Sequence, residues 1–148
     1  MEVKNLLDPE VKQEMIDRIN RLRPASQRKW GSMDVSQMLA HCQKPIQVAL
    51  GQHIPKGSFL LRVFGPMFKS SLYNDRPYSR NLPTDKTFKI TSSKDFEKEK
   101  SALVNLINNF TEDNIIKGPH PIFGKLTRDQ WSLSMWKHTD HHLHQFGV

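Results

Sequence analysis

The chain has 148 residues, a single cysteine and a formal net charge of +7. This length suits one domain, residues 1–148, and the lone Cys42 excludes an internal disulfide framework and fits a reducing compartment. The lysines and arginines are interleaved with acids rather than gathered in a basic block, and the most apolar stretch, FLLRVFGPMF, is too short to cross a bilayer. We therefore expect a cytoplasmic protein with neither a nucleic-acid nor a membrane partner.

A first amphipathic helix is predicted near the N-terminus. Asp8 is placed to cap it, and Pro9 suits its first position. Apolar residues then recur at helical spacing until the helix ends at Leu22 or Arg23, just before Pro24.

Two further helices are predicted before a long loop. The first runs from about residue 33 or 34 to about residue 50, and Pro45 inside it indicates a kink or a break. Residues 58–73 favour a shorter apolar helix, or two helices split at Gly65 and Pro66. The pattern then fails from residue 74 to residue 92, where only residues 87–90 could form a strand. Because long loops in small domains are often functional, we expect residues 74–92 to border a site.

The second half of the chain contains the two clearest helices. Ser93 can cap one whose apolar stripe ends at Phe110. Thr127 and Gln130 form a capping box that opens a last helix, which runs to about Phe146. Four long amphipathic helices with one long crossover connection predict an all-α fold, a four-helix bundle.

Four of the seven histidines lie between His138 and His144, on the last helix. His138 and His142 are one helical turn apart, about 40° around the axis, on the side that should face the interior. A pair of hydrogen-bonded core histidines would explain this spacing without a ligand. A third histidine, His41, lies at the edge of the apolar arc of the second helix. Three imidazoles converging from two helices would form an open tri-histidine site for a divalent metal ion.

Other polar residues near these histidines are candidates for supporting roles. His141 lies at the margin of the inward face, so it is either solvated or a contact of the ligands. Gln37 and Gln145, each about one turn from a ligand, would orient ligands or substrate if they are not simply surface glutamines. Asp140 is expected on the helix surface, and no residue of the sequence stands out as a general base or other catalytic group.

Several motifs of the chain resemble one known family. They are W-G-x-M-x-x-x-Q-M-L-A-H-C from Trp30 to Cys42, HPIFGKLTRDQW, and the C-terminal KHTDHHLHQFGV. These stretches are similar to the DinB/YfiT-like superfamily of helical bundles, and specifically to its branch of unassigned function. Intermediate pieces, FLLRVFGPMFK, NLPT at Asn81 to Thr84 and KDFEKEK, are similar too, so the resemblance covers nearly the whole chain. The wider superfamily often has arginine after the last ligand, where this chain has Leu143, so no role for that arginine carries over.

The resemblance implies a four-helix bundle with one metal ion held by His41, His138 and His142. It also implies thiol-dependent chemistry, because characterised relatives include bacillithiol transferases and a mycothiol-dependent isomerase. We therefore expect a metal-dependent enzyme that activates a thiol or water for S-transfer or hydrolysis of a small-molecule substrate. Zinc is the preferred ion, with nickel, manganese or iron as alternatives, and a low-molecular-weight thiol is the expected cosubstrate. The alternative is a non-catalytic protein that binds a metal or small ligand on the same fold.

Self-association is a further expectation. Trp136 and Leu143 lie on the side of the last helix away from His138, where a surface helix would be polar. They are buried either by residues 58–73 or a terminus, or by a second subunit. Because two-fold dimers are the commonest oligomers, we expect a homodimer.

Overall fold

The computed structural model describes residues 1–148, and every regular element in it is helical. The prediction of an all-α fold is confirmed. None of the helices combines the length and the apolar character that a membrane span requires. The elements are α1 (Pro9–Arg21), α2 (Val35–Ala49), α3 (Phe59–Phe68), η1 (Lys69–Leu72), η2 (Lys86–Phe88), α4 (Phe96–Asn109) and α5 (Arg128–Gln145), where η marks a 3₁₀ helix.

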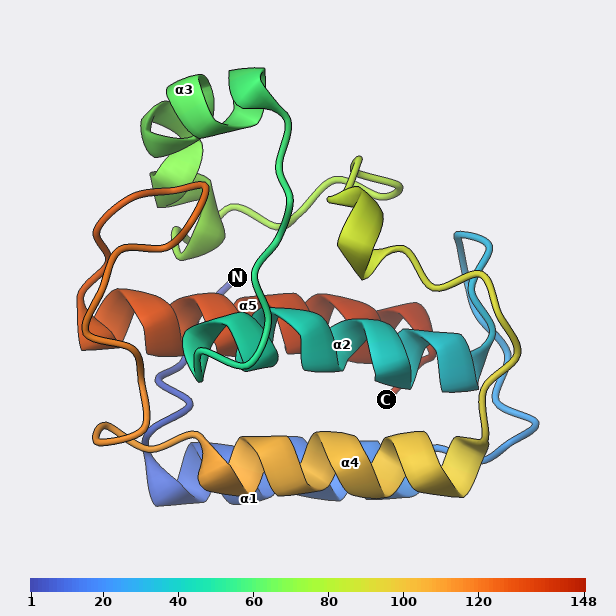
Figure 1. Cartoon of the computed structure of the whole chain (residues 1–148). Helices are drawn as coiled ribbons and strands as arrows, with labels where there is room; N and C mark the ends of the chain where they lie inside the picture. Colours follow the sequence, from blue (N-terminus) through green and yellow to red (C-terminus); the bar gives the residue numbers. More distant parts are fainter.

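The four long helices lie side by side, and α3 stands apart from them (Figure 1). Helix α2 packs against both α4 and α5, and α1 closes the arrangement by packing against the same two helices. Helices α2 and α4 run in the same direction, so residues 50–95 must return the chain along the molecule (Figure 1). This long crossover, which contains α3, η1 and η2, passes over α2 and α5.

The helix starts follow the capping signals of the sequence with one exception. Asp8 caps α1, and Thr127 with Gln130 forms the expected capping box of α5. The exception is α4, whose cap is Asp95 rather than Ser93. The Asp95 carboxylate accepts a hydrogen bond from the Lys98 backbone at 2.8 Å, and a shorter helix follows from this later start.

The two internal prolines do not break their helices. Helix α2 continues through Pro45, and α3 continues through Pro66, so of the two alternatives for residues 58–73 the single helix holds and the split at Gly65 and Pro66 does not occur. The chain changes instead to a 3₁₀ helix at Lys69. Gly65 has a packing role, because a side chain there would collide with the backbone of Ile122. The segment 87–90 is not a strand either, since its first residues belong to η2.

The apolar back of α5 is covered by the chain itself. Trp136 is 5% exposed and Leu143 is fully buried within one core cluster. The N-terminal segment contributes Leu6 to that cluster and is tied to α5 by a hydrogen bond from the Leu7 backbone to Ser132 Oγ, at 3.0 Å. The expectation of a homodimer therefore loses the observation on which it rested.

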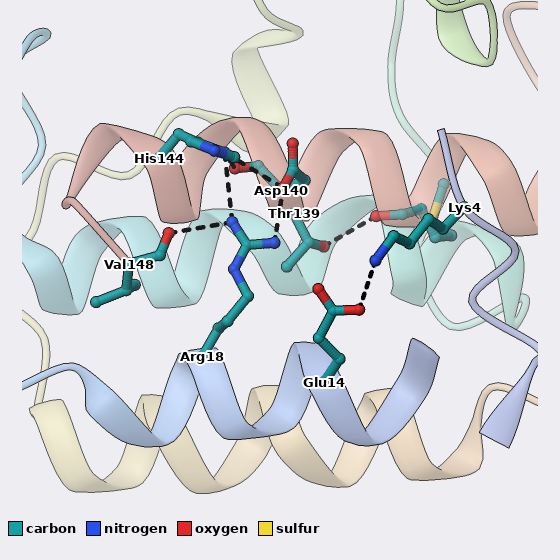
Figure 2. Close-up of polar contacts among 8 residues, drawn as sticks. Lys4, Glu14, Arg18, Thr139, Asp140, His144 and Val148 are labelled. Carbon is teal, nitrogen blue, oxygen red and sulfur yellow. Dashed lines mark hydrogen bonds and ion pairs between the residues drawn. The ribbon is translucent and has the colours of Figure 1, made fainter. Parts of the chain in front are cut away.

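A buried ion pair joins α1 to α5. Asp140, expected on the helix surface, is only 3% exposed and accepts a hydrogen bond from Arg18 Nη1 at 2.6 Å. The second terminal nitrogen of Arg18 donates to the Val148 carbonyl at 3.0 Å and lies 3.3 Å from His144 Nδ1 (Figure 2). One guanidinium thus fixes both the middle and the end of the C-terminal segment.

We expect Asp140→Ala to lower the free energy of unfolding by about 3–5 kcal/mol, because it leaves the Arg18 charge buried without a partner. Urea denaturation monitored by circular dichroism measures this change. The matched control is Glu14→Ala, which removes the exposed pair between Lys4 and Glu14 (Figure 2). The control should change stability little, and equal losses in the two variants would contradict the assignment.

Candidate metal centre

Helices α2 and α5 bring three histidines together at their interface. His41 comes from the middle of α2, and His138 and His142 come from successive turns of α5. One ring nitrogen of each lies within 4.8 Å of those of the other two, and His41 Nε2 is 3.2 Å from His138 Nε2. His41 is buried, and the other two are partly buried. The structure thus places together the three residues that the sequence singled out.

The helix around His41 is adapted to this residue. Pro45 follows it by four positions and has no backbone N–H, so the His41 carbonyl cannot accept the usual helical hydrogen bond. The side chain of His41 is fixed from outside the helix, because its Nδ1 lies 2.9 Å from the Phe88 carbonyl. A carbonyl can only accept, so Nδ1 carries the proton of the neutral ring. The lone pair of Nε2 therefore points toward the other histidines.

The tautomer of His142 is set in the same way through a glutamine. Gln145 Nε2 donates to the Trp30 carbonyl at 2.7 Å, which orients the amide. Its oxygen then faces His142 and accepts from Nδ1 at 2.8 Å. The proton of neutral His142 thus lies on Nδ1, and Nε2 is free to bind a ligand. Gln145, one of the two glutamines that the sequence offered for orienting ligands or substrate, is thus hydrogen-bonded to one of the three imidazoles.

His138 has no such partner. Its Nδ1 is buried and makes no hydrogen bond. Its Nε2 must donate the 3.2 Å contact to His41, because His41 Nε2 has no proton to give. A buried nitrogen without a partner is uncommon in folded proteins. His41 and His142 are therefore held with the lone pairs of Nε2 facing the cluster. His138 instead carries its proton on Nε2, and a metal ion that bound there would displace this proton.

Burial keeps all three rings neutral. It lowers the pKa of His41 and lowers that of His138 well below its ordinary value, where the neighbouring imidazoles add to the effect. Burial, with a smaller contribution from His41, lowers the pKa of His142 to about 3. All three are accordingly deprotonated at neutral pH, which is the form in which histidine binds metal ions.

This donor set fits a divalent metal ion. In a tetrahedral zinc site with Zn–N bonds of about 2.0–2.1 Å, the ligand nitrogens lie about 3.3 Å apart. His41 and His138 already have that separation, and the third nitrogen is near enough for side-chain rotation to close the set. The neutral state of all three rings agrees with a site for a cation. No carboxylate or thiol belongs to the cluster.

Aromatic groups and the long loop surround the histidines. His141 packs edge-on against His142 and lies 5.6 Å, centroid to centroid, from Trp30 and 5.7 Å from Tyr78. Arg80 lies over the Trp30 ring at 4.7 Å. Because the loop 74–92 supplies Tyr78, Arg80 and the Phe88 carbonyl, the prediction that it borders the site is confirmed.

One candidate of the sequence, Gln37, and two other polar residues of the chain, His120 and Cys42, lie outside the site. Gln37 forms the capping box of α2 with Asp34, so it orients the helix and contacts none of the three histidines. His120 stacks on Trp131 and holds the connector before α5. Cys42 is fully buried beside Met38, and burial raises the pKa of its thiol, so it is no nucleophile.

Sequence reasoning missed the residues that act through their backbone. The carbonyls of Phe88 and Trp30 leave no signal in a side-chain pattern, although Trp30 begins the first motif noted above. It also missed Lys137, which is almost completely buried beside His138. Its ammonium group donates to the carbonyls of Ser71 and Asn74 at 2.7 and 2.8 Å and fixes the end of η1 on α5.

We expect the metal-free protein to lose stability as the pH falls from 6.5 toward 3. The folded state holds His142 with a pKa of about 3, whereas the unfolded chain takes up this proton near pH 6.5. Stability from this residue is thus nearly complete above pH 6.5, and about 3 kcal/mol is lost by pH 4. Urea titrations from pH 7 to pH 4 should show a smaller loss for His142→Gln, and an identical loss would contradict the shift.

A family model described as "Protein of unknown function (DUF1569)" matches residues 1–147. No curated protein and no solved structure matches the chain.

Proposed function

The chain thus belongs to the DUF1569 family, whose function is unknown, and we propose that it is a metal-dependent enzyme with one divalent ion held by His41, His138 and His142. The observation that carries this proposal is the convergence of three neutral imidazoles, two of them with tautomers preset by the Phe88 carbonyl and by Gln145. The sequence resemblance to DinB/YfiT-like proteins agrees with it. So do the arrangement of α1, α2, α4 and α5, which we interpret as a four-helix bundle, and the single long crossover between the parallel α2 and α4 (Figure 1).

The reaction that we propose is S-transfer or hydrolysis on a small-molecule substrate. Zinc is the ion that we favour, with nickel, manganese and iron as alternatives, since imidazole ligands suit several of these metals. When bound, such an ion supplies Lewis acidity that lowers the pKa of a water or thiol ligand. A low-molecular-weight thiol in a reducing cytoplasm, to which the unpaired Cys42 is suited, is the cosubstrate that we propose.

The residues of the chain have three tasks in this proposal. Phe88 and Gln145 hold His41 and His142 in the tautomer that leaves Nε2 free. The aromatic rings of Trp30 and Tyr78 pack against His141, which in turn packs against His142. Arg80, held over Trp30, places a cation beside this rim, where an anionic part of a substrate would be attracted.

A non-catalytic metal-binding role is the second candidate, and one observation favours it. General acid–base catalysis requires a titratable group near the reacting atoms, and no carboxylate lies in the histidine cluster. Asp140, the nearest in sequence, is already paired with Arg18. Incubation of the zinc-loaded protein with low-molecular-weight thiols and electrophilic acceptors distinguishes the two roles. Turnover that requires the metal supports the enzyme, and tight metal binding without turnover supports the second role.

We expect His41→Ala, His138→Ala and His142→Ala each to reduce the metal content well below one ion per chain, because two imidazoles do not hold a divalent ion as three do. Metal analysis of untagged protein purified without added metal measures this. His144→Ala, an exposed histidine of the same helix, is the control and should retain the wild-type content. Full retention in the His138 and His142 variants would remove the site from consideration.

We expect Gln145→Leu to weaken metal binding by about 10–100-fold, because the ring of His142 then loses the acceptor that fixes its tautomer. Competition with a chromophoric chelator gives the affinity. Gln37→Leu is the matched control, since Gln37 lies one turn before His41 but contacts only the helix start and the Ser92 carbonyl. Equal affinities in the two variants would refute the positioning role of Gln145.

A further inference from the structure

Helix α3 presents an apolar face to solvent. Six of its ten residues are large, apolar and between 49% and 78% exposed. They are Phe59, Leu60, Val63, Phe64, Met67 and Phe68. Exposed apolar residues scattered over a surface are ordinary, but a contiguous set on one short helix marks an interaction site.

The orientation of α3 on the molecule is the reverse of that of an ordinary surface helix. Its only buried residue is Gly65, which lies so close to the Ile122 backbone that no side chain fits between them. Val63 and Met67 are each two positions away and therefore point about 160° from the contact with the body. The helix packs through its smallest residue and turns its large apolar residues outward.

The charged side chains on α3 and beside it in the sequence are all cations, and the carboxylate of Asp85 accepts a hydrogen bond from the Gly57 backbone at 2.8 Å just before the helix. No aspartate or glutamate occurs from residue 35 to residue 74, whereas Lys56, Arg62 and Lys69 accompany the helix. The guanidinium of Arg62 folds back to the Lys56 carbonyl at 3.2 Å, and Lys69 donates to the Lys125 carbonyl at 3.3 Å. Neither cation is neutralised by a carboxylate, because both bind only backbone oxygens.

We propose that α3 docks on the surface of a bilayer that contains anionic phospholipids. A helix with an apolar face and accompanying cations lies in the plane of the interface, with its apolar side chains among the acyl chains and its cations at the phosphates. α3 is much too short to span the bilayer. The expectation of no membrane partner rested on the absence of a membrane span, and binding at the bilayer surface needs no span. Figure 1 shows α3 apart from the four long helices, at the outside of the molecule.

A second copy of the chain is the competing occupant of this face, and the charges disfavour it. Two-fold pairing through α3 would bring both sets of Lys56, Arg62 and Lys69 together, and the Asp85 carboxylate at the start of the helix already accepts hydrogen bonds from the Gly57 and Thr87 backbones. Anionic headgroups supply the missing negative charge. The apolar face and the cations are therefore both satisfied by one lipid surface.

Cosedimentation with vesicles tests the proposal. Wild-type protein should bind phosphatidylcholine vesicles that contain about 30% phosphatidylserine and should bind pure phosphatidylcholine far less, with the difference reduced by salt. The double variant Leu60→Gln with Met67→Gln should bind the anionic vesicles at least about tenfold less, because it loses two apolar side chains that the bilayer would bury. Leu82→Gln is the matched control, since Leu82 is 54% exposed but lies outside α3, and its binding should equal that of wild type.

Three results would overturn the proposal. The first is absence of wild-type binding to the anionic vesicles, and the second is equal binding to the two vesicle types. The third is a dimer of wild-type protein in light scattering that the double variant converts to a monomer, which would assign the face to a second copy. Circular dichroism of each variant shows that a loss of binding does not come from unfolding.

Discussion

The burial of three imidazoles between α2 and α5 is the constraint on which the rest of the structure depends. Imidazole is costly to bury unless its nitrogens have partners, and charged imidazole is costlier still. At His41 and His142 a backbone carbonyl and the Gln145 amide supply hydrogen-bond partners for the buried nitrogens. The charged form is avoided because all three rings are neutral. One buried nitrogen, His138 Nδ1, has no hydrogen-bond partner. A core selected only for stability would replace such a histidine with an apolar residue.

The long crossover connection serves this constraint. The segment from residue 50 to residue 95 returns over α2 and α5, and it places the Phe88 carbonyl against His41 on its way. The same segment is attached to α5 beside the site, where Lys137 holds the end of η1 through two carbonyls and the Asn74 side chain. Burying a lysine for three hydrogen bonds is expensive, and burial lowers the pKa of its ammonium group. The position of the loop is therefore fixed by strong contacts and not by the connection alone.

The sequence predicted the parts of the structure that depend on local chemistry. Capping residues and the helical period gave α1, α2 and α5, and the i, i+4 spacing of His138 and His142 indicated one inward face. It failed where distant residues decide the outcome. Ser93 and Asp95 are both good caps, and in the structure the helix begins after Asp95 with the buried Phe96 as its first residue. Its position on α5 alone indicates that Asp140 lies on the surface. Asp140 is buried because Arg18 of α1 packs against it and forms an ion pair with it.

The pairing of Asp140 with Arg18 also shapes the electrostatics of the histidine cluster. The carboxylate closest in sequence to the ligands is turned away from them and neutralised by a guanidinium 2.6 Å away. Because the three ligands are neutral and no carboxylate joins them, nothing in the cluster offsets the charge of a divalent ion. Such a site favours anionic ligands, among them thiolate and hydroxide, more strongly than a site with carboxylate ligands does. In the function that we propose, a water or thiol bound to the ion would still release a proton, and with no carboxylate in the cluster that proton would go to solvent.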